Sequence, residues 1–404
     1  MIQKVVKNYI PELTGLRALA AFLVFIHHFS YIISAGCPIA VQHYLREFNI
    51  GLPVFFALAG FSIAYRYYDK FSLTTKWFRP YLINRMARIY PMYFLLTIVS
   101  FIYYYYYSGP KSIAGSSGHP IAVLLLNLTF IRGFFDDFKF TGVGQGWSLT
   151  INMCFYVFAP FIFFVIKKWK FSYSQPIAFT AFGVLLVLIF RNFNWYGFFG
   201  NFTYMMLYSF FGRCLELFGG VWVAIYIRKN GFGRTNNIKF TYIGIAGILA
   251  CVYVLSRLPV LPGKEYSLQS AYGILTNNYF VGPSTLLFLF GLLTEETLVK
   301  KLLSTKLFNI LGKSSYVLYL IHLGLINDQL HKAANYLNDR VFELYDKWGI
   351  DWVSPLQNDK VNLLLIFIVL NLIAVFLYRF IEEPLNQYIR VSYKGVAEKK
   401  VIVQ

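Results

Sequence analysis

Three ionisable side chains stand inside an apolar, helix-forming run near the start of the sequence. The run, residues 15–28, reads GLRALAAFLVFIHH and carries Arg17 near its beginning and His27 and His28 at its end. Arg17 and His28 are eleven residues apart, about three turns and roughly 16 Å of rise in an α-helix. Both side chains therefore return to nearly the same face and are expected to look into one cavity at different depths. An ionisable group inside an apolar span is a functional hypothesis by default. In the structural alternative, Arg17 reaches the lipid headgroups and the histidines hydrogen-bond to neighbouring helices.

A second pair of arginines precedes a later apolar run. Residues 78–91 read FRPYLINRMARIYP, and Arg85 and Arg88 lie three positions apart, on one face of the expected helix. Two guanidinium groups side by side suit a phosphorylated ligand better than a single lipid headgroup. The alternative is that both arginines anchor the helix at the cytoplasmic surface of a membrane, and this local pattern alone favours that simpler interpretation.

Polar side chains also stand near one end of the run at 147–166. Residues 144–156 read GQGWSLTINMCFY, in which Ser148, Thr150 and Asn152 lie among apolar neighbours. These groups either hydrogen-bond to a sugar or join neighbouring helices.

Three more ionisable residues interrupt apolar segments further along. Arg213 and Glu216 are three positions apart, which favours an ion pair inside the bundle with a structural role. His322 ends the segment LGKSSYVLYLIH at 311–322. By itself, such a histidine is more often a packing group than a catalyst.

The composition is that of a membrane protein that crosses the bilayer many times. Of 404 residues, 57% are hydrophobic and 14% charged, with a mean hydropathy of +0.54, more apolar surface than a soluble domain needs. The net charge of +19 does not indicate nucleic acid, because the lysines and arginines form short clusters between apolar runs. No two of the four cysteines have C-x-x-C spacing, so we expect neither a disulfide framework nor a metal site.

Ten apolar runs are long enough to be spans, and they predict an all-α bundle of about ten transmembrane helices. The runs are approximately 13–35, 50–64, 89–107, 147–166, 176–190, 203–227, 240–256, 280–294, 307–327 and 361–380. Basic clusters follow alternate runs, at 66–88, 167–170, 228–239, 300–306 and 390–400, and Lys4 and Lys7 precede the first. All of them fall on one side if both termini are cytoplasmic. The connection 328–360 carries no basic excess, so it is expected on the opposite side.

Residues 120–131 are apolar but too short to count as a span, and counting them would move the cluster at 167–170 to the wrong side. We therefore predict a re-entrant or interfacial segment there. The first run lacks a small-residue cleavage site, so it is expected to be retained as a span. The expected organisation is a membrane domain over 1–384 and a short basic cytoplasmic tail over 385–404.

Six motifs follow one another along nearly the whole chain. They are GLRALAAFLVFIHH at 15–28, FFALAGF at 55–61, RMARIYP at 85–91, WSL with FY at 147–149 and 155–156, GKSSYVLYLIH at 312–322, and IEEPL at 381–385. Their order and spacing resemble the acyltransferase-3 family of integral-membrane acyltransferases. Many members of that family carry a C-terminal hydrolase-like domain, and this sequence resembles the stand-alone membrane domain.

The resemblance implies a membrane O-acyltransferase that moves groups other than amino-acyl groups. The donor would be cytoplasmic acyl-CoA, usually acetyl-CoA, and the acceptor a hydroxyl of an envelope glycan or glycolipid, such as lipopolysaccharide O-antigen or exopolysaccharide. The implied location is the cytoplasmic (inner) membrane of a bacterium, with no metal and no nucleic acid partner. The implied roles are phosphate binding by Arg17, Arg85 and Arg88, base or acyl carrier for His28, and substrate binding by Trp147, Ser148, Tyr316 and His322.

Three positions depart from the family pattern. Thr14 stands where the family usually has aspartate, Ala59 where it has serine, and Asn152 where it has an acidic residue. Replacing that carboxylate with an amide removes a potential charge but keeps hydrogen-bonding capacity. Asn152 is thus a candidate catalytic position, and an impaired family member is one alternative. The other is a transporter or flippase of a glycan or lipid, because intramembrane arginines and histidines also suit that class.

Overall fold

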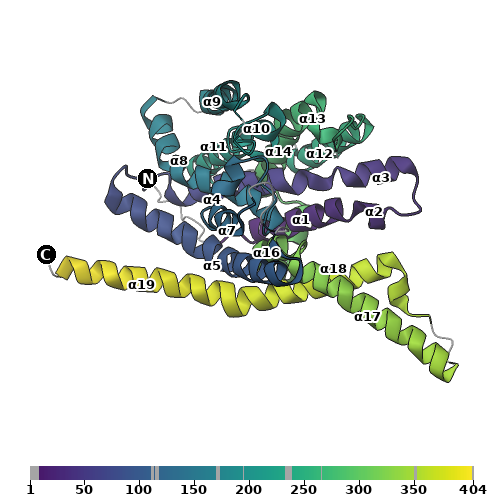
Figure 1. Ribbon diagram of the computed structural model, residues 1–404. Helices are drawn as coiled ribbons and strands as arrows, with labels where there is room; N and C mark the ends of the chain where they lie inside the picture. The colour runs from purple at the N-terminus through teal and green to yellow at the C-terminus, as the bar shows by residue number, and fades with distance from the viewer. Residues whose placement is uncertain are drawn as a thin grey trace.

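The computed structural model describes residues 9–110, 113, 118–169, 173–193, 195–232, 239–264, 266–349 and 353–402 (Figure 1). Within these ranges the chain forms helices and no β-sheet, and one isolated bridge pairs Phe135 with Phe198. The all-α prediction is confirmed. The basic residues Lys4, Lys7, Lys170 and Arg234 lie outside the described residues.

Helices follow one another along the whole described chain. They are α1 (Pro11–His28), α2 (Ser30–Ile33), α3 (Ile39–Arg46), α4 (Gly51–Tyr67), α5 (Thr75–Tyr107), α7 (Pro120–Leu128), α8 (Trp147–Trp169), α9 (Ser174–Phe190), α10 (Phe202–Tyr208), α11 (Cys214–Asn230), α12 (Phe240–Arg257), α13 (Ala271–Thr276), α14 (Gly282–Thr294), α15 (Leu298–Leu303), α16 (Lys306–Ile321), α17 (Leu325–Trp348), α18 (Asp359–Leu377) and α19 (Glu383–Ile402). Two π-helical turns, η6 (Asn277–Val281) and η8 (Tyr378–Glu382), precede α14 and α19.

Among the described residues, five helical stretches are long and apolar enough to cross a membrane. They are Ile39–Tyr67, Thr75–Tyr107, Gly144–Trp169, Phe240–Arg257 and Asp359–Tyr393. The other predicted runs are also helical, but they are shorter, less apolar or interrupted. A membrane protein with several spans is therefore supported. The count of ten, the cytoplasmic ends and the re-entrant placement of α7 stay predictions.

The predicted run at 203–227 is two helices rather than one, because α10 ends before α11 begins. Asn278 stabilises the break: its side-chain amide donates to the carbonyl oxygens of Met206 at 2.9 Å and Gly212 at 3.0 Å. Carbonyl groups at a helix end lack intrahelical donors and need such partners when buried. The partner lies far along the chain, so the local pattern did not reveal the break.

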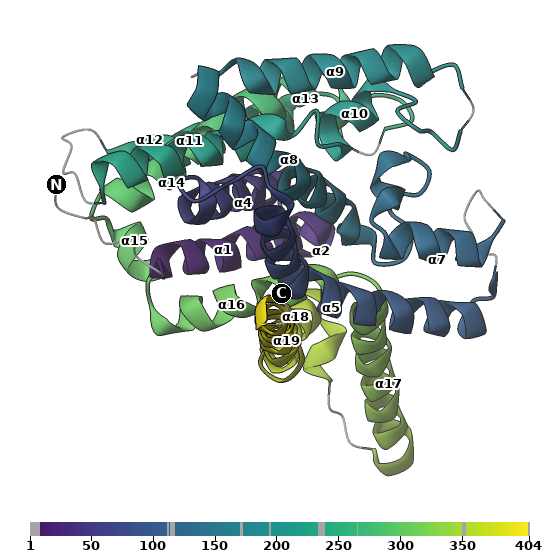
Figure 2. The same ribbon diagram turned by 90° about the vertical axis from the view of Figure 1, so that its left-hand side faces the viewer.

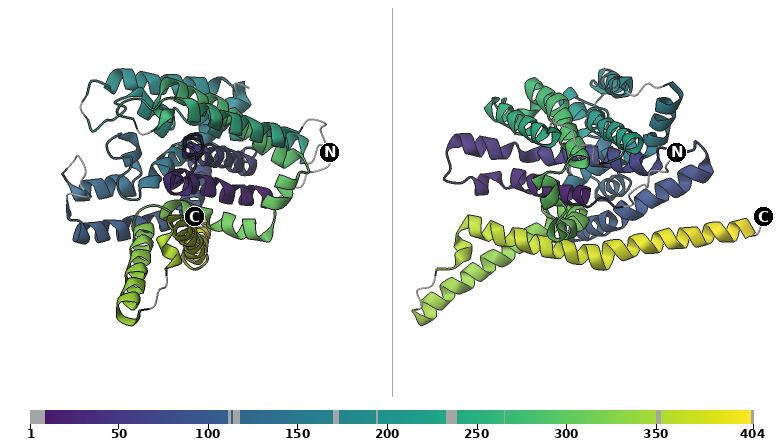
Figure 3. Two further views of the ribbon diagram at one scale, coloured as in Figure 1. Left: turned by 90° about the vertical axis from the view of Figure 1, so that its right-hand side faces the viewer. Right: turned by 180° about the vertical axis from the view of Figure 1, so that it is seen from behind.

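Two segments expected to be a connecting loop and a short tail are largely helical. The expected loop at 328–360 contains most of α17, which extends away from the packed body, as does α19 in another direction (Figures 1 and 3). The predicted tail at 385–404 belongs to α19, which continues from α18 through the π-helical turn η8. A π-helical turn accommodates an extra residue in a continuous helix. The helix therefore passes the predicted boundary at Pro384 without a linker.

The first helix lies at the centre of the assembly. α1 packs between α4 and α16, α4 packs on α11, and α16 packs on α18 (Figure 2). Two glycines permit backbones to approach closely at these contacts. A Cβ on Gly60 would lie 1.9 Å from the carbonyl oxygen of Leu217 in α11, and one on Gly312 would lie 1.9 Å from that of Thr14 in α1. These motif glycines therefore serve helix packing.

Replacing Gly60 with alanine should destabilise the protein, because the added methyl group meets backbone rather than a movable side chain. Overpacking of this kind costs about 1–3 kcal/mol, so the unfolding temperature of the detergent-solubilised chain should fall. Gly144→Ala is the matched control, since a Cβ there meets no atom within 4 Å. Equal unfolding temperatures for the two variants would contradict the close approach of α4 and α11.

Candidate active site

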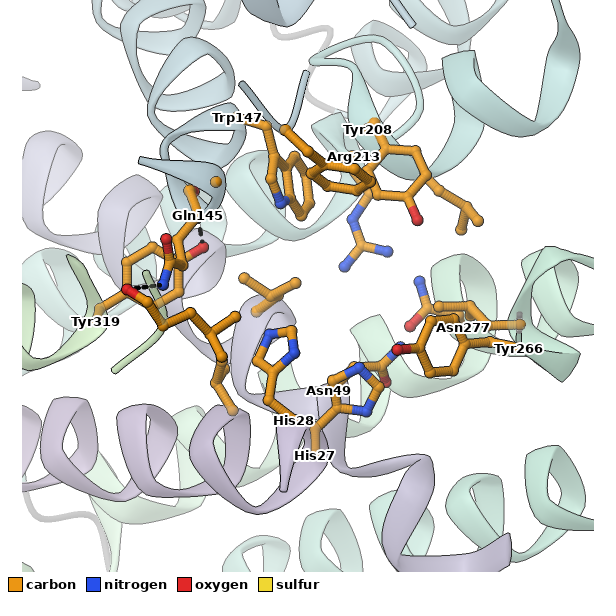
Figure 4. A pocket seen from close by; sticks show the side chains of 17 residues that line it. His27, His28, Asn49, Gln145, Trp147, Tyr208, Arg213, Tyr266, Asn277 and Tyr319 are labelled. Carbon is orange, nitrogen blue, oxygen red and sulfur yellow. Dashed lines mark hydrogen bonds between the residues drawn. The ribbon is translucent and has the colours of Figure 1, made fainter. Parts of the chain in front are cut away.

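The C-terminal end of α1 opens into a cavity of about 280 Å³. His27 and His28 enter it from α1, and Arg213 and Tyr208 approach from the opposite wall (Figure 4). Trp147 lines the same wall, with its ring edge-to-face against Tyr208 at a centroid distance of 5.0 Å. We call this space the histidine cavity.

The two adjacent histidines differ in their surroundings. His27 donates from Nδ1 to the carbonyl oxygen of Arg46, and its ring lies 5.1 Å from that of Tyr266. The ring of His28 makes no hydrogen bond with any described residue, and its centroid lies 5.2 Å from that of His322. His27 is therefore held by the fold, whereas the ring nitrogens of His28 are available to a ligand.

His322 stands behind His28 at the end of α16. It is 2% exposed, its Nδ1 lies 2.8 Å from the carbonyl oxygen of Tyr319, and its Nε2 is buried without a partner among the described residues. Because a carbonyl only accepts, Nδ1 carries the proton, and a neutral ring then leaves Nε2 as an acceptor. His322 can thus accept a hydrogen bond from an N–H of His28 or from a hydroxyl group.

The three predicted phosphate-binding arginines lie together in a second cavity of about 130 Å³. Arg17 donates to Ser62 at 3.3 Å, and Arg85 donates to the hydroxyl of Tyr67 at 3.1 Å. Nε of Arg85 is buried without a partner in the described part of the chain. We call this space the arginine cavity.

The arginine cavity has no acidic side chain among its described lining residues. The buried carboxyl group of Glu382 interacts electrostatically with Arg88, but its Oε2 makes no hydrogen bond within the described ranges. Three positively charged guanidinium groups thus face one small space with few carboxylates nearby to neutralise their charge. This arrangement favours an anionic ligand, because unpaired buried charge is costly.

The remaining predicted site residues divide between the two cavities. Trp147 belongs to the histidine cavity, whereas Ser148, Asn152 and Tyr316 line the arginine cavity. The hydroxyl of Tyr316 donates to the carbonyl of Ile89 at 2.8 Å, so it is already satisfied. Asn152 differs, because its Oδ1 is buried and has no partner in the described chain.

The two cavities meet at Tyr319. This side chain and Leu52 line both spaces. The Tyr319 hydroxyl lies 2.9 Å from Oγ of Ser148 and 3.1 Å from the carbonyl oxygen of Gln145. The hydrogen-bonded Tyr319 thus stands between the arginine cavity and the histidine cavity. The eleven-residue spacing on α1 predicted that Arg17 and His28 look into one cavity; instead, Arg17 lines the arginine cavity and His28 lines the histidine cavity.

Sequence reasoning missed several residues of the histidine cavity. Asn49, Gln145, Tyr266 and Asn277 contribute from four separate segments, and no local pattern marks them. Tyr319 had a usable signal, because it lies three positions from both Tyr316 and His322 on the same helix.

The expected ion pair in this region is confirmed. Arg213 and Glu216 are buried with 2.9 Å between nitrogen and oxygen, and Arg213 also donates to Asn278 at 2.9 Å. Its guanidinium group therefore has fixed partners, although it faces the cavity. The described residues contain no group of three histidine, cysteine or acidic side chains that could hold a metal ion.

The described chain is thus a helical bundle with several membrane-length apolar helices and two internal cavities, each of which carries ionisable side chains. A family model described as "Acyltransferase domain" matches residues 10–379. The chain therefore belongs to the acyltransferase-3 family, as its motifs predicted.

Two relatives illustrate the similarity. Acyltransferase MdmB of Streptomyces mycarofaciens is 29% identical over 169 residues, covering 39% of this chain and 40% of that protein. O-acetyltransferase OatA of Staphylococcus aureus (strain NCTC 8325 / PS 47) is 24% identical over 410 residues, covering 97% of this chain and 60% of that protein. The chain thus spans 40–60% of these relatives' length. No solved structure matches it.

Proposed function

We propose that the chain is a membrane O-acetyltransferase that moves an acetyl group from acetyl-CoA, bound at the arginine cavity, to a hydroxyl group in the histidine cavity. The observation that carries this proposal is the meeting of the two cavities at Tyr319. One cavity offers cations and the other offers an available histidine. Family membership and the relatives named as acyltransferase and O-acetyltransferase support the same reaction class.

The donor side follows from charge. CoA carries several phosphate groups, and Arg85 and Arg88 with Arg17 offer guanidinium forks that suit phosphate oxygens. The arginine cavity, at about 130 Å³, is smaller than the pockets that enclose whole ligands. It would therefore hold part of the donor, with the rest outside. With both termini cytoplasmic, as the basic clusters predict, this cavity would face the cytoplasm, where acyl-CoA is available.

The chemistry needs one base. His28 would take the proton of the acceptor hydroxyl, whose oxygen attacks the thioester carbonyl carbon; the carbon–sulfur bond breaks and the CoA sulfur leaves, taking up a proton. In the second route, a nitrogen of His28 attacks the thioester carbonyl carbon, the carbon–sulfur bond breaks, and the CoA sulfur leaves with the proton of the other ring nitrogen. The acceptor hydroxyl then attacks the acetyl group, and its proton passes to His28 as the acetyl–nitrogen bond breaks. In either route, His322 would orient His28 through its free Nε2.

The acceptor would be an envelope glycan or glycolipid, such as lipopolysaccharide O-antigen or exopolysaccharide, in a bacterial cytoplasmic membrane. The histidine cavity combines the aromatic faces of Trp147, Tyr208 and Tyr266 with the amides of Asn49 and Gln145. Aromatic faces with a few polar groups suit a ligand that has both apolar and hydroxyl surfaces.

The direct test uses the purified chain in nanodiscs with acetyl-CoA radiolabelled in its acetyl group. Incubation with an envelope glycolipid fraction should consume the thioester and place the label on that fraction. If the acetyl-CoA thioester stays intact with every glycolipid fraction tested, the proposed acetyl transfer is wrong. Glycolipid movement across vesicles without thioester loss would instead favour a transporter.

Asn152 gives a prediction of increased activity. Its unpaired, buried Oδ1 lines the arginine cavity at the position where the family has an acidic residue. Asn152→Glu should restore a group able to hold or move a proton and raise turnover about tenfold or more. Asn152→Gln, which has the same length as glutamate but no charge, is the control. If both variants lose activity equally, the chain has adapted to asparagine and is not impaired by it.

A further inference from the structure

The first half of α17 is fixed to the end of α5. The carboxyl group of Asp328 accepts from the hydroxyl of Tyr104 at 2.8 Å, and the hydroxyl of Tyr103 accepts from Gln329 at 2.8 Å and from Lys332 at 3.2 Å. Ala334 is buried on the same half. This end of α17 therefore has a set position on the bundle.

The second half of α17 carries an apolar stripe and extends away from the body (Figures 1 and 2). Leu337, Val341, Leu344 and Trp348 recur at spacings of four, three and four residues, which place them on one helix face. Leu337 is 53% exposed, Leu344 43% and Trp348 73%. The stripe continues the face that is buried at Ala334, so apolar surface persists where protein cover ends.

Charged side chains are distributed unevenly around this stripe. At 100° per residue, Arg340 and Lys347 lie beside the stripe, whereas Asp339 and Asp346 lie on the opposite face. Arg340 also contacts Glu343 at 2.6 Å. Cations at the edge of an apolar face, with carboxylates turned away, are typical of a helix that lies on lipid with anionic headgroups.

We propose that the second half of α17 lies in the lipid headgroup region at this end of the bundle, with Leu337, Val341, Leu344 and Trp348 turned into the bilayer. The neighbouring surfaces also suit lipid. Tyr106 and Tyr107 at the end of α5 are 78% and 77% exposed, as in an aromatic belt. α18, which contacts α17, exposes Leu364, Ile368 and Leu372. The stripe therefore continues a lipid-facing surface. This inference does not depend on acetyl transfer.

The apolar stripe of α17 fits a second copy of the chain less well than it fits lipid. Helix pairing through an apolar seam requires three or more heptads, and Leu337 to Trp348 spans fewer than two. Trp348 at the far end also suits the membrane interface, where tryptophan is enriched.

The test uses the full chain in nanodiscs that contain anionic lipid. A nitroxide label is placed on the stripe by Leu344→Cys, with Val341→Cys as a second reporter, and on the opposite face by Asp339→Cys. The chain with only its native cysteines gives the background. The ratio of collisions with oxygen, which enters lipid, to collisions with a water-soluble nickel chelate should be several-fold higher at 344 and 341 than at 339.

Two results would overturn this inference. Equal water access on both faces would place α17 in solvent. Spin–spin broadening at 344 that disappears on dilution with unlabelled chain would assign the stripe to a second copy. In a further arm, Arg340→Gln with Lys347→Gln should lower the collision ratio at 344 in anionic nanodiscs and leave it unchanged in neutral ones. A ratio that ignores these changes would contradict the role of the cations.

Discussion

Replacing His28 with alanine is expected to lower acetyl transfer about a thousandfold, the range of a lost general base, while acetyl-CoA binding stays unchanged. The reason is spatial separation, because His28 lies in the histidine cavity and the arginines line the other. Turnover would be measured as thioester consumption by the chain in nanodiscs, and binding by calorimetry on the same preparation.

His27 provides the control within the same helix. Its Nδ1 is already engaged by the carbonyl oxygen of Arg46, so His27→Ala should affect turnover far less than His28→Ala. His322→Gln, which keeps a hydrogen-bonding group, should give an intermediate loss, because His322 would act through His28. If the His27 and His28 variants lose turnover equally, the choice of His28 is wrong.

The double change Arg85→Ala with Arg88→Ala is expected to weaken acetyl-CoA binding about a hundredfold or more. Hydrogen bonds to charged groups contribute about 1.5–3 kcal/mol each, and two guanidinium groups would be lost. Both line the arginine cavity without an acidic lining residue to neutralise them among the described positions. Calorimetry on the purified chain gives the dissociation constant directly.

A charge-matched control distinguishes direct contact between the cavity arginines and acetyl-CoA from a general electrostatic attraction of acetyl-CoA to a basic protein. Lys76→Ala with Arg79→Ala removes the same charge from the start of α5, where both side chains are exposed and outside the cavity lining. This variant should bind acetyl-CoA almost as the unmodified chain does. If the two double variants weaken binding equally, the arginine cavity is not the donor site.

The parts of the site that sequence reasoning identified depend on local geometry. Arg17 and His28 share one helix, so a spacing of eleven residues predicted different depths on one face, although the two side chains line separate cavities rather than one. Arg85 and Arg88 share α5, and their three-residue spacing predicted a common face. Both pairs contribute to cavity linings.

The parts that were missed depend on distant segments. At the break before α11, two backbone carbonyl groups accept hydrogen bonds from the side chain of Asn278. Between the two cavities, the hydroxyl of Tyr319 hydrogen-bonds to Ser148 and Gln145, which belong to a different part of the chain. α17 was missed for a different reason: its many charged residues resembled a solvent-exposed connection, although its apolar residues repeat with helical spacing.

The most direct test of the central claim is the sidedness of transfer. The chain would be reconstituted in vesicles of known orientation, with radiolabelled acetyl-CoA supplied only on the side of the arginine cavity and a glycolipid acceptor in the membrane. Because α1 carries Arg17 in its first half and His28 at its other end, label is expected on acceptor hydroxyls on the opposite side, and His28→Ala should abolish its appearance. Label confined to the side of supply, or transfer that persists without His28, would contradict transfer from the arginine cavity to the histidine cavity through His28.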